Sequence, residues 1–166
     1  MIKFQDKDTL RRLNFKHPAP WLATWFGLGL LKPGPGTWGT LGALPFGIAL
    51  MMYGNLQILL AAILLTFLIG LWAAKHFEQM IREKDSGMVV VDEVVGMWIA
   101  LIPATLSPLS IGTAFVLFRL FDILKPWPIG WLDRKLRGPM GVMLDDVMAG
   151  IYAALVMIGL HYVQLG

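Results

Sequence analysis

Two pairs of neighbouring carboxylates are the residues of this chain whose types and positions suggest chemistry. Asp92 and Glu93 open one uncharged run, and Asp145 and Asp146 open another. Two negative charges beside apolar surface cost free energy through desolvation and mutual repulsion, unless a cation or hydrogen bonds offset that cost. A divalent cation is the simplest such partner. The alternative is that these acids only cap helices, where the free N–H groups and the dipole favour a carboxylate.

A third cluster combines two basic residues with one acid. Arg119, Asp122 and Lys125 are spaced at i, i+3 and i+6, roughly one face of a helix. Arg binds phosphate with a planar fork and Lys binds it as a point charge. A purely structural salt bridge between Arg119 and Asp122 is the alternative. Asp133 and Arg134 belong to the same charged island.

A segment rich in glycine and proline, residues 32–40, precedes an apolar run. Glycines let backbone N–H groups converge on an anion, and a helix N-terminus favours phosphate. Thr37 is placed to cap the helix that follows. The segment can therefore hold a phosphate group, although a plain turn between two helices explains it equally well.

Several other chemistries are excluded by composition. The chain has no cysteine, which rules out a cysteine phosphatase, disulfides and thiolate metal sites. Its three histidines, His17, His76 and His161, lie outside all the polar clusters, so a histidine nucleophile has little support. A net charge of +3, with the bases beside apolar runs, favours anionic lipid headgroups over nucleic acid as a partner.

The elements that must position these residues are those of a membrane protein. The 166 residues are 57% hydrophobic, with a mean hydropathy of +0.65. Residues 33–74, 94–118 and 147–166 contain no Asp, Glu, Lys or Arg, which is the pattern of membrane segments. We therefore expect one domain, residues 1–166, that is all-α: a small polytopic membrane helical bundle with short re-entrant or interfacial helices. A soluble bundle of deeply buried helices is the alternative.

The topology follows from the charges and the turn signals. Residues 1–20 are basic and are predicted to lie in the cytoplasm, and residues 21–31 suit a short interfacial or re-entrant helix. A turn at residues 53–55 divides the first uncharged run into a helical hairpin. Pro103 and Pro108 favour a second, shallow hairpin in 94–118 over a single span, and only the hairpin brings all the acids to one side.

Four motifs, taken together and in this order, resemble the phosphatidylglycerophosphatase A family from about residue 21 to residue 150. They are Phe26-Gly27-x-Gly29-Leu30 with Pro35-Gly36-Thr37-x-Gly39-Thr40; Asp92-Glu93-x-x-Gly96; Phe118-Arg119-x-x-Asp122-x-x-Lys125-Pro126-x-Pro128 with Asp133; and Gly141-Val142-Met143-x-Asp145-Asp146-x-x-Ala149-Gly150. The resemblance implies a multi-pass, Mg²⁺-dependent phosphatase of the bacterial inner membrane, with its active site facing the cytoplasm. Its substrate would be a lipid phosphomonoester, phosphatidylglycerophosphate, and its product phosphatidylglycerol.

The resulting site prediction assigns three sets of residues. The metal ligands are expected among Asp92, Glu93, Asp122, Asp145 and Asp146, and the catalytic set adds Lys125 and Asp133. The substrate-binding set is Gly36, Thr37, Thr40, Arg119, Lys125 and Arg134. Either a metal-bound water or one of the Asp residues would attack the phosphorus. Two other functions stay open, a lipid headgroup transferase of the CDP-alcohol type and a carboxylate-lined transporter, as does the oligomeric state.

Overall fold

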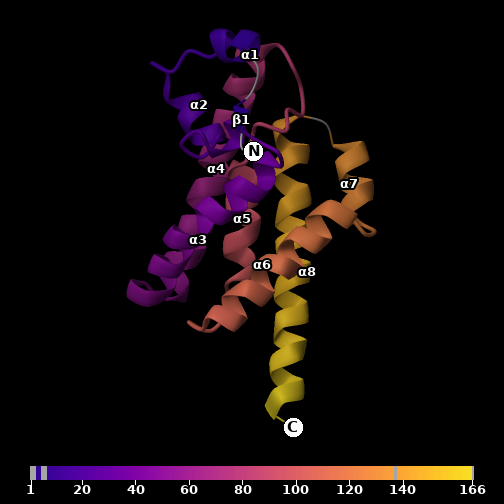
Figure 1. Cartoon of the computed structure of the whole chain (residues 1–166). Coiled ribbons are helices and arrows are strands. Elements are labelled where there is room, and N and C mark those ends of the chain that lie inside the picture. Colours follow the sequence, from indigo (N-terminus) through magenta and orange to yellow (C-terminus); the bar gives the residue numbers. More distant parts are fainter. Residues whose placement is uncertain (1–2, 5–6, 137, 166) are drawn as a thin grey trace.

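The computed structural model describes residues 3–4, 7–136 and 138–165, with the side chains of residues 8, 10–132, 134–136 and 138–161. Helices form most of it (Figure 1), as predicted. The all-α prediction missed one small feature, a two-stranded antiparallel ladder. It pairs β1 (Lys3–Phe4) with β2 (Leu31–Lys32).

Eight α-helices and a short 3₁₀ turn make up the helical part of the described chain. They are α1 (Lys7–Arg12), α2 (Pro18–Ala23), η1 (Leu28–Leu30), α3 (Pro35–Tyr53), α4 (Leu56–Ile81), α5 (Val91–Ala100), α6 (Pro108–Leu124), α7 (Ile129–Lys135) and α8 (Pro139–Leu165). Two of them, α4 and α8, are long and apolar enough to cross a membrane, over Leu56–Ile81 and Pro139–His161. These two helices indicate a membrane protein.

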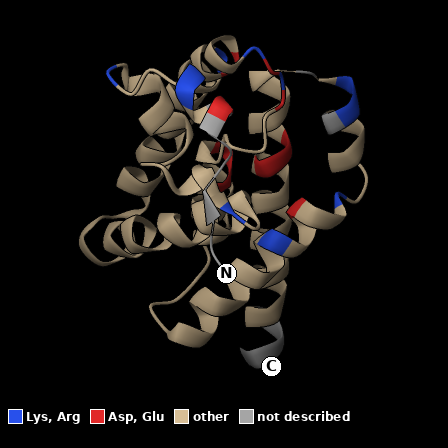
Figure 2. Ribbon diagram, turned by 45° about the horizontal axis from the view of Figure 1, so that its top comes forward, with Lys and Arg blue, Asp and Glu red and all other residues tan. Residues whose placement is uncertain are grey.

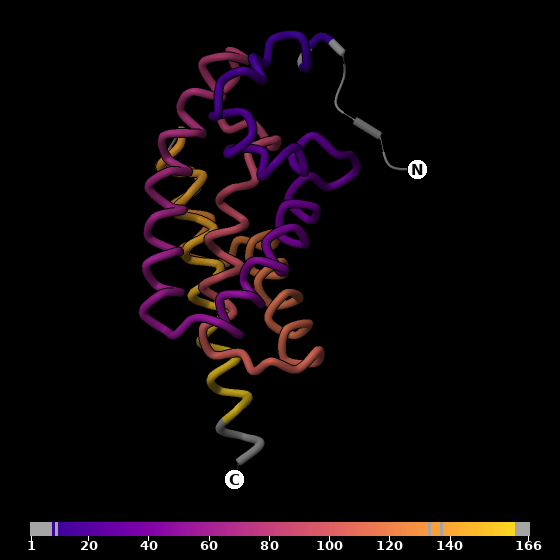
Figure 3. The backbone as a smooth tube through the Cα atoms, turned by 90° about the vertical axis from the view of Figure 1, so that its left-hand side faces the viewer, coloured from indigo at the N-terminus to yellow at the C-terminus, as the bar shows by residue number. Residues whose placement is uncertain are grey.

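Both predicted hairpins are present. The Asn55 side chain caps α4 by accepting a hydrogen bond from the Ile58 N–H at 2.9 Å, directly after α3 ends. Ser107 caps α6 in the same way, at 3.1 Å from the Ser110 nitrogen. In Figure 3 the two turns lie at the same end of the molecule, opposite the loop between α4 and α5. With ten residues, α5 is about 15 Å long, too short to span a bilayer.

The core is organised around α5, which packs against α3, α4, α6 and α8. It is apolar on nearly every face after its first turn, and almost all of its residues are buried, as expected for a helix enclosed by others. The outer face of α4 is different, because Leu60, Leu64 and Leu68 are each about half exposed. An apolar face that no other part of the described chain covers suits contact with lipid.

Two local predictions were wrong. Thr37 does not cap α3, because the helix already begins at Pro35 and its N-cap is Gly34. Proline is preorganised for the first helical position, which moves the start of the helix toward the N-terminus. The helix expected over residues 21–31 ends at Ala23, where the chain turns through left-handed residues at Trp25, Phe26 and Gly27.

Candidate active site

The acid pairs meet because α5 and α8 approach each other unusually closely. A Cβ atom added to Gly96 would lie 2.6 Å from the carbonyl oxygen of Asp146, and one added to Gly150 would lie 3.0 Å from the Cα of Gly96. Each glycine stands four residues, about one helical turn, beyond an acid of its own helix, Asp92 or Asp146. The glycines therefore let the two backbones come together directly beside the carboxylates.

Three of the five predicted metal ligands form a compact group, which we call the carboxylate trio: Asp92, Glu93 and Asp146. One carboxylate oxygen of each lies within 4.8 Å of those of the other two. Asp92 and Asp146 are only 6% and 3% exposed. One buried oxygen on each residue, Asp92 Oδ1, Glu93 Oε2 and Asp146 Oδ2, has no hydrogen-bond partner among the described residues.

Burial makes ionisation of the two α5 acids costly. Desolvation, followed by the charges of Glu93 and Asp146, raises the pKa of the Asp92 carboxyl well above its usual value. Desolvation also raises the pKa of Glu93, although a hydrogen bond with Asp92 and the charge of Arg119 lower it in part. Their place in the first turn of α5 favours negative charge through the helix dipole, but only by about 0.3–1 kcal/mol. A bound cation would remove the remaining cost.

Arg119 lies at the edge of the trio. Its Nη1 atom is 2.5 Å from Asp122 Oδ2 and 3.8 Å from Glu93 Oε1, and it donates to Thr40 Oγ1 at 3.5 Å. Its Nε atom is buried and has no partner among the described residues. The ion pair between Arg119 and Asp122, which was the structural alternative to a role in phosphate binding, is present, and it adjoins the acid group. The charge of Asp122 also acts on Asp146.

The start of α3 closes one side of this group. A Cβ atom on Gly36 would collide with Glu93 Oε1 and lie 3.1 Å from Arg119 Nη1, so a side chain at this position would displace the Glu93 carboxylate. Thr40 Oγ1 donates to the Gly36 carbonyl oxygen at 2.7 Å and faces Arg119. Two of the three predicted loop residues, Gly36 and Thr40, therefore reach the site, whereas no described hydrogen bond joins the Thr37 side chain to it.

Asp145 and Lys125 form a separate ion pair. Lys125 Nζ is 2.6 Å from Asp145 Oδ2, while Asp145 Oδ1 accepts a hydrogen bond from the Asp146 N–H at 3.1 Å. Lys125 is the left-handed C-cap of α6, with a φ of 44°. This turn takes it away from Arg119, so the expected common face of Arg119, Asp122 and Lys125 is not formed as a straight row. The ion pair also sets Asp145 apart from the trio.

The remaining predicted residues lie elsewhere or are not described. Arg134 is exposed on α7, and no described hydrogen bond or ion pair connects it to the trio. The side chain of Asp133 lies outside the described residues. Because α8 begins at Pro139, Asp145 and Asp146 stand in its second turn, so the helix-cap alternative does not hold for them. Figure 2 shows the charged residues gathered over one half of the molecule.

One functional link was missed by sequence reasoning. Glu78 Oε1, near the end of α4, accepts a hydrogen bond from the Asp85 N–H at 3.0 Å. Asp85 Oδ1 in turn accepts from the Gly138 N–H at 2.8 Å, just before α8. This chain of bonds holds the start of the helix that carries Asp146. The sequence Asp85-Ser86-Gly87 is typical of a turn, and it gives no sign of the contact with Gly138.

The chain was compared with known proteins. Residues 21–161 match the family model described as Phosphatidylglycerophosphatase A. A phosphatidylglycerophosphatase A from Haemophilus influenzae is 40% identical over 163 residues, covering 96% of this chain and 99% of that protein. One from Escherichia coli is 38% identical over 160 residues, covering 94% and 92%. The chain belongs to the phosphatidylglycerophosphatase A family. No solved structure matches it.

Membership of the phosphatidylglycerophosphatase A family makes the chain a phosphatase, a hydrolase of phosphoric monoesters. It favours that activity over the transferase and the transporter. A third relative, from Bacteroides thetaiotaomicron, is 39% identical over 139 residues, which cover 80% of this chain and 86% of that protein. It bears a provisional name as a phosphatidylinositol-3-phosphatase. The names of all three relatives specify a phosphate carried by a lipid.

Proposed function

We propose that this chain hydrolyses the terminal phosphate of phosphatidylglycerophosphate, producing phosphatidylglycerol and inorganic phosphate during phospholipid synthesis. The relatives named for this reaction support the substrate. The observation that carries the proposal within the structure is the carboxylate trio beside Arg119. Within the described part of the chain, these acids have oxygens and this base has an N–H without a partner, and a metal-dependent phosphatase needs both kinds of group.

The residues present fit a Mg²⁺ ion. Mg²⁺ prefers carboxylate oxygens and water as ligands, and Asp92, Glu93 and Asp146 each offer an oxygen that no described residue hydrogen-bonds. We infer that these three residues hold the ion. When bound, it would neutralise charge on the phosphoryl oxygens and activate the group that attacks phosphorus. Asp122 and Asp145 are already paired with Arg119 and Lys125, so we assign them to positioning these bases instead.

Arg119 is the proposed phosphate-binding residue. Its Nη1 is committed to Asp122, Glu93 and Thr40, which fixes the plane of the guanidinium group. The buried Nε–H has no acceptor among the described residues, and a phosphoryl oxygen is an acceptor of the matching kind. Because the donor is already oriented, little reorganisation is needed when charge develops in the transition state.

The site is proposed to face the cytoplasm in a multi-pass protein of the bacterial inner membrane. Lys84 and Lys135 are exposed on the loop after α4 and on α7, in the segments that lead into α5 and α8, and basic loops lie on the cytoplasmic side. The turn at residues 53–55 and the turn before α6 lie at the other end (Figure 3). This arrangement supports a phosphate-binding end at the headgroup level of one leaflet.

Phosphate release from phosphatidylglycerophosphate by the purified protein tests the proposal. We expect release that requires Mg²⁺ and stops in EDTA. Asp146→Asn should abolish most of it, with partial recovery at raised Mg²⁺, because the change removes one ligand charge and keeps the side-chain size. Asp8→Asn is the matched control, since Asp8 is a highly exposed carboxylate on α1. Full activity in EDTA would refute the metal assignment, and full activity of Asp146→Asn would refute the placement of the site.

A further inference from the structure

An apolar groove runs between α3 and α6, away from the carboxylate trio. It has a volume of about 510 Å³ and is lined by Ile48, Met52, Leu106, Pro108, Ile111 and Gly112. No charged residue lines it. In contrast, the same two helices meet at their other ends through the polar contact between Thr40 and Arg119.

The groove and the polar contact lie along the same rows of side chains. On α3, Thr40 is followed at intervals of four residues by Leu44, Ile48 and Met52, and such residues are neighbours on one side of a helix. On α6, Arg119 is preceded at the same interval by Phe115 and Ile111. Leu44 and Phe115 are partly buried and pack against the core. The two rows thus change from polar to apolar over one turn.

The spacing fits a lipid. Ile48 and Ile111 stand eight residues from Thr40 and Arg119, about 12 Å along each helix axis, and Met52 stands about 18 Å from Thr40. The hydrocarbon region of one leaflet is about 15 Å thick, half of the bilayer core. A phosphate beside Arg119 would therefore place its acyl chain at the depth of the groove.

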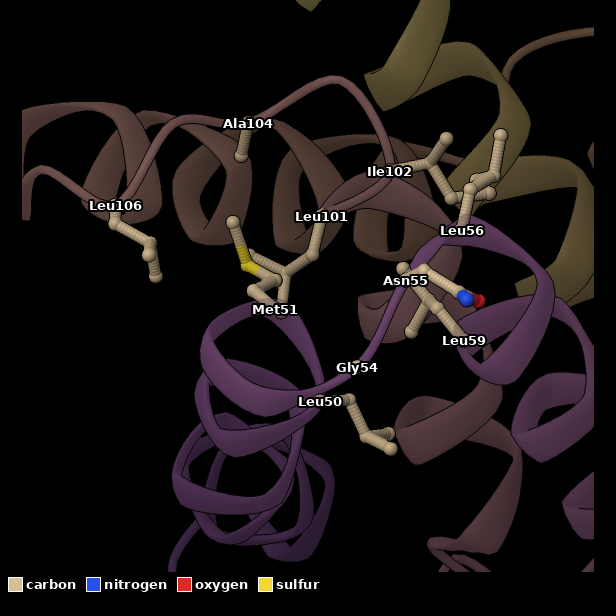
Figure 4. Close-up of a pocket in the computed structure, with 10 residues that line it drawn as sticks. All are labelled: Leu50, Met51, Gly54, Asn55, Leu56, Leu59, Leu101, Ile102, Ala104 and Leu106. Carbon is tan, nitrogen blue, oxygen red and sulfur yellow. The ribbon is translucent and has the colours of Figure 1, made fainter.

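We propose that this groove binds one acyl chain of the lipid phosphomonoester substrate. The inference rests on the proposed function, since it takes the occupant of the Arg119 end to be the phosphate of that lipid. The phosphate group would then contact the polar end of the two rows, near Arg119, and the hydrocarbon chain would contact the apolar groove at their other end. Beyond Leu106 the groove adjoins a second pocket of about 230 Å³, formed by the turns after α3 and α5 (Figure 4).

Substitution of Gly112, which lines the groove, tests whether the groove binds an acyl chain. A Cβ atom added there meets nothing within 4 Å, so Gly112→Leu adds side-chain volume at a groove-lining position whose first added atom contacts no described residue. Gly159 on α8 is equally open and does not line the groove, which makes Gly159→Leu the matched control. Met52→Trp narrows the groove from its other wall, on an exposed residue, and serves as a second, independent variant.

The assay compares two substrates that share the headgroup, a dihexanoyl and a dioleoyl phosphatidylglycerophosphate. We expect Gly112→Leu and Met52→Trp to lower kcat/KM for the dioleoyl lipid by about tenfold or more, since hydrophobic sites discriminate by roughly that factor for small changes in fit. Both should leave kcat/KM for the dihexanoyl lipid within about twofold of wild type. Gly159→Leu should match wild type on both substrates.

The outcomes separate the inference from the proposed function. A wild-type protein that is inactive on both lipids would refute the function itself. An active wild type whose groove variants lose equal activity on both lipids, or on neither, would overturn the groove assignment alone. A changed oligomeric mass of Gly112→Leu, measured by light scattering, would instead show that a second copy of the chain occupies the groove, which also overturns the assignment.

Discussion

Gly150→Ala is the change that most directly tests how the carboxylate trio is built. The added Cβ would lie 3.0 Å from the Cα and 3.1 Å from the carbonyl carbon of Gly96, and in contact with its oxygen. Carbon atoms pack favourably at about 3.5–4.0 Å. The obstacle is backbone, which no side-chain rotation removes, so α5 and α8 must separate by about half an ångström or more at this point.

The energetic cost can be estimated from two opposing effects. Overpacking of a well-packed interior costs about 1–3 kcal/mol. Replacing Gly by Ala inside a helix contributes about 0.8–1.0 kcal/mol of stability through propensity. Gly159→Ala has the second effect without the first, because nothing lies within 4 Å of its added Cβ. The difference in unfolding free energy between the two variants isolates the packing cost, and we expect about 1–3 kcal/mol.

The functional consequence of Gly150→Ala follows from the position of this glycine relative to the acids. Asp146 is one turn from Gly150 and Asp92 is one turn from Gly96, so a wider gap between the helices also widens the trio. We therefore expect Gly150→Ala to need more Mg²⁺ for half-maximal activity, and Gly159→Ala to need the same amount as wild type. Thermal unfolding in detergent and a Mg²⁺ titration of phosphate release measure the two quantities. Equal stability and equal Mg²⁺ requirement of the two alanine variants would refute the reasoning.

Three further predictions concern charge and topology. Asp92→Asn should be inactive and yet unfold at a higher temperature than metal-free wild type, because burial raises the pKa of this carboxyl. The penalty for ionising it grows as pH rises from the usual Asp range through the folded-state pKa, so the two proteins should converge at low pH. Lys125→Ala should destabilise the fold by about 3 kcal/mol, since it leaves the buried Asp145 charge without this partner, and adding Asp145→Asn should restore most of that stability. In sealed vesicles, cysteines introduced at Lys84 and Lys135 should label from one side and a cysteine at Asn55 from the other; labelling of all three from one side would contradict the topology.

Local signals in the sequence were enough to predict the hairpins. The residues Gly54 and Asn55, and the prolines at 103 and 108, restrict the backbone through their own chemistry, whatever the rest of the chain does. Both turns are found where they were expected. The small β-ladder was not predicted, because strands of two residues leave no periodic pattern to detect.

The sequence could not predict in the same way which of the five acids form the carboxylate trio and which pair with basic residues. Asp145 and Asp146 are neighbours on α8, and successive residues of a helix point about 100° apart. Which one faces α5 depends on how α8 is rotated in the bundle, and that rotation is set by Gly96 and Gly150. The pairing of Asp145 with Lys125 depends on the left-handed turn that ends α6. Neither feature is visible in the spacing of the charges alone.

Cation binding at the proposed site would be coupled to helix packing, because the trio takes its acids from two different helices. A cation that binds only the packed form stabilises that packing, by about 2.7 kcal/mol at a hundredfold excess over its Kd. Because the pKa values of Asp92 and Glu93 are raised, protons compete with a cation for these carboxylates, so the affinity should fall as pH falls. Substitutions of acids and of glycines then have opposite signatures in the metal-free protein. An acid variant relieves repulsion and gains stability while losing the ligand, whereas a glycine variant loses stability and affinity together. The two kinds of variant thus tell whether a loss of activity comes from the charge of the site or from its geometry.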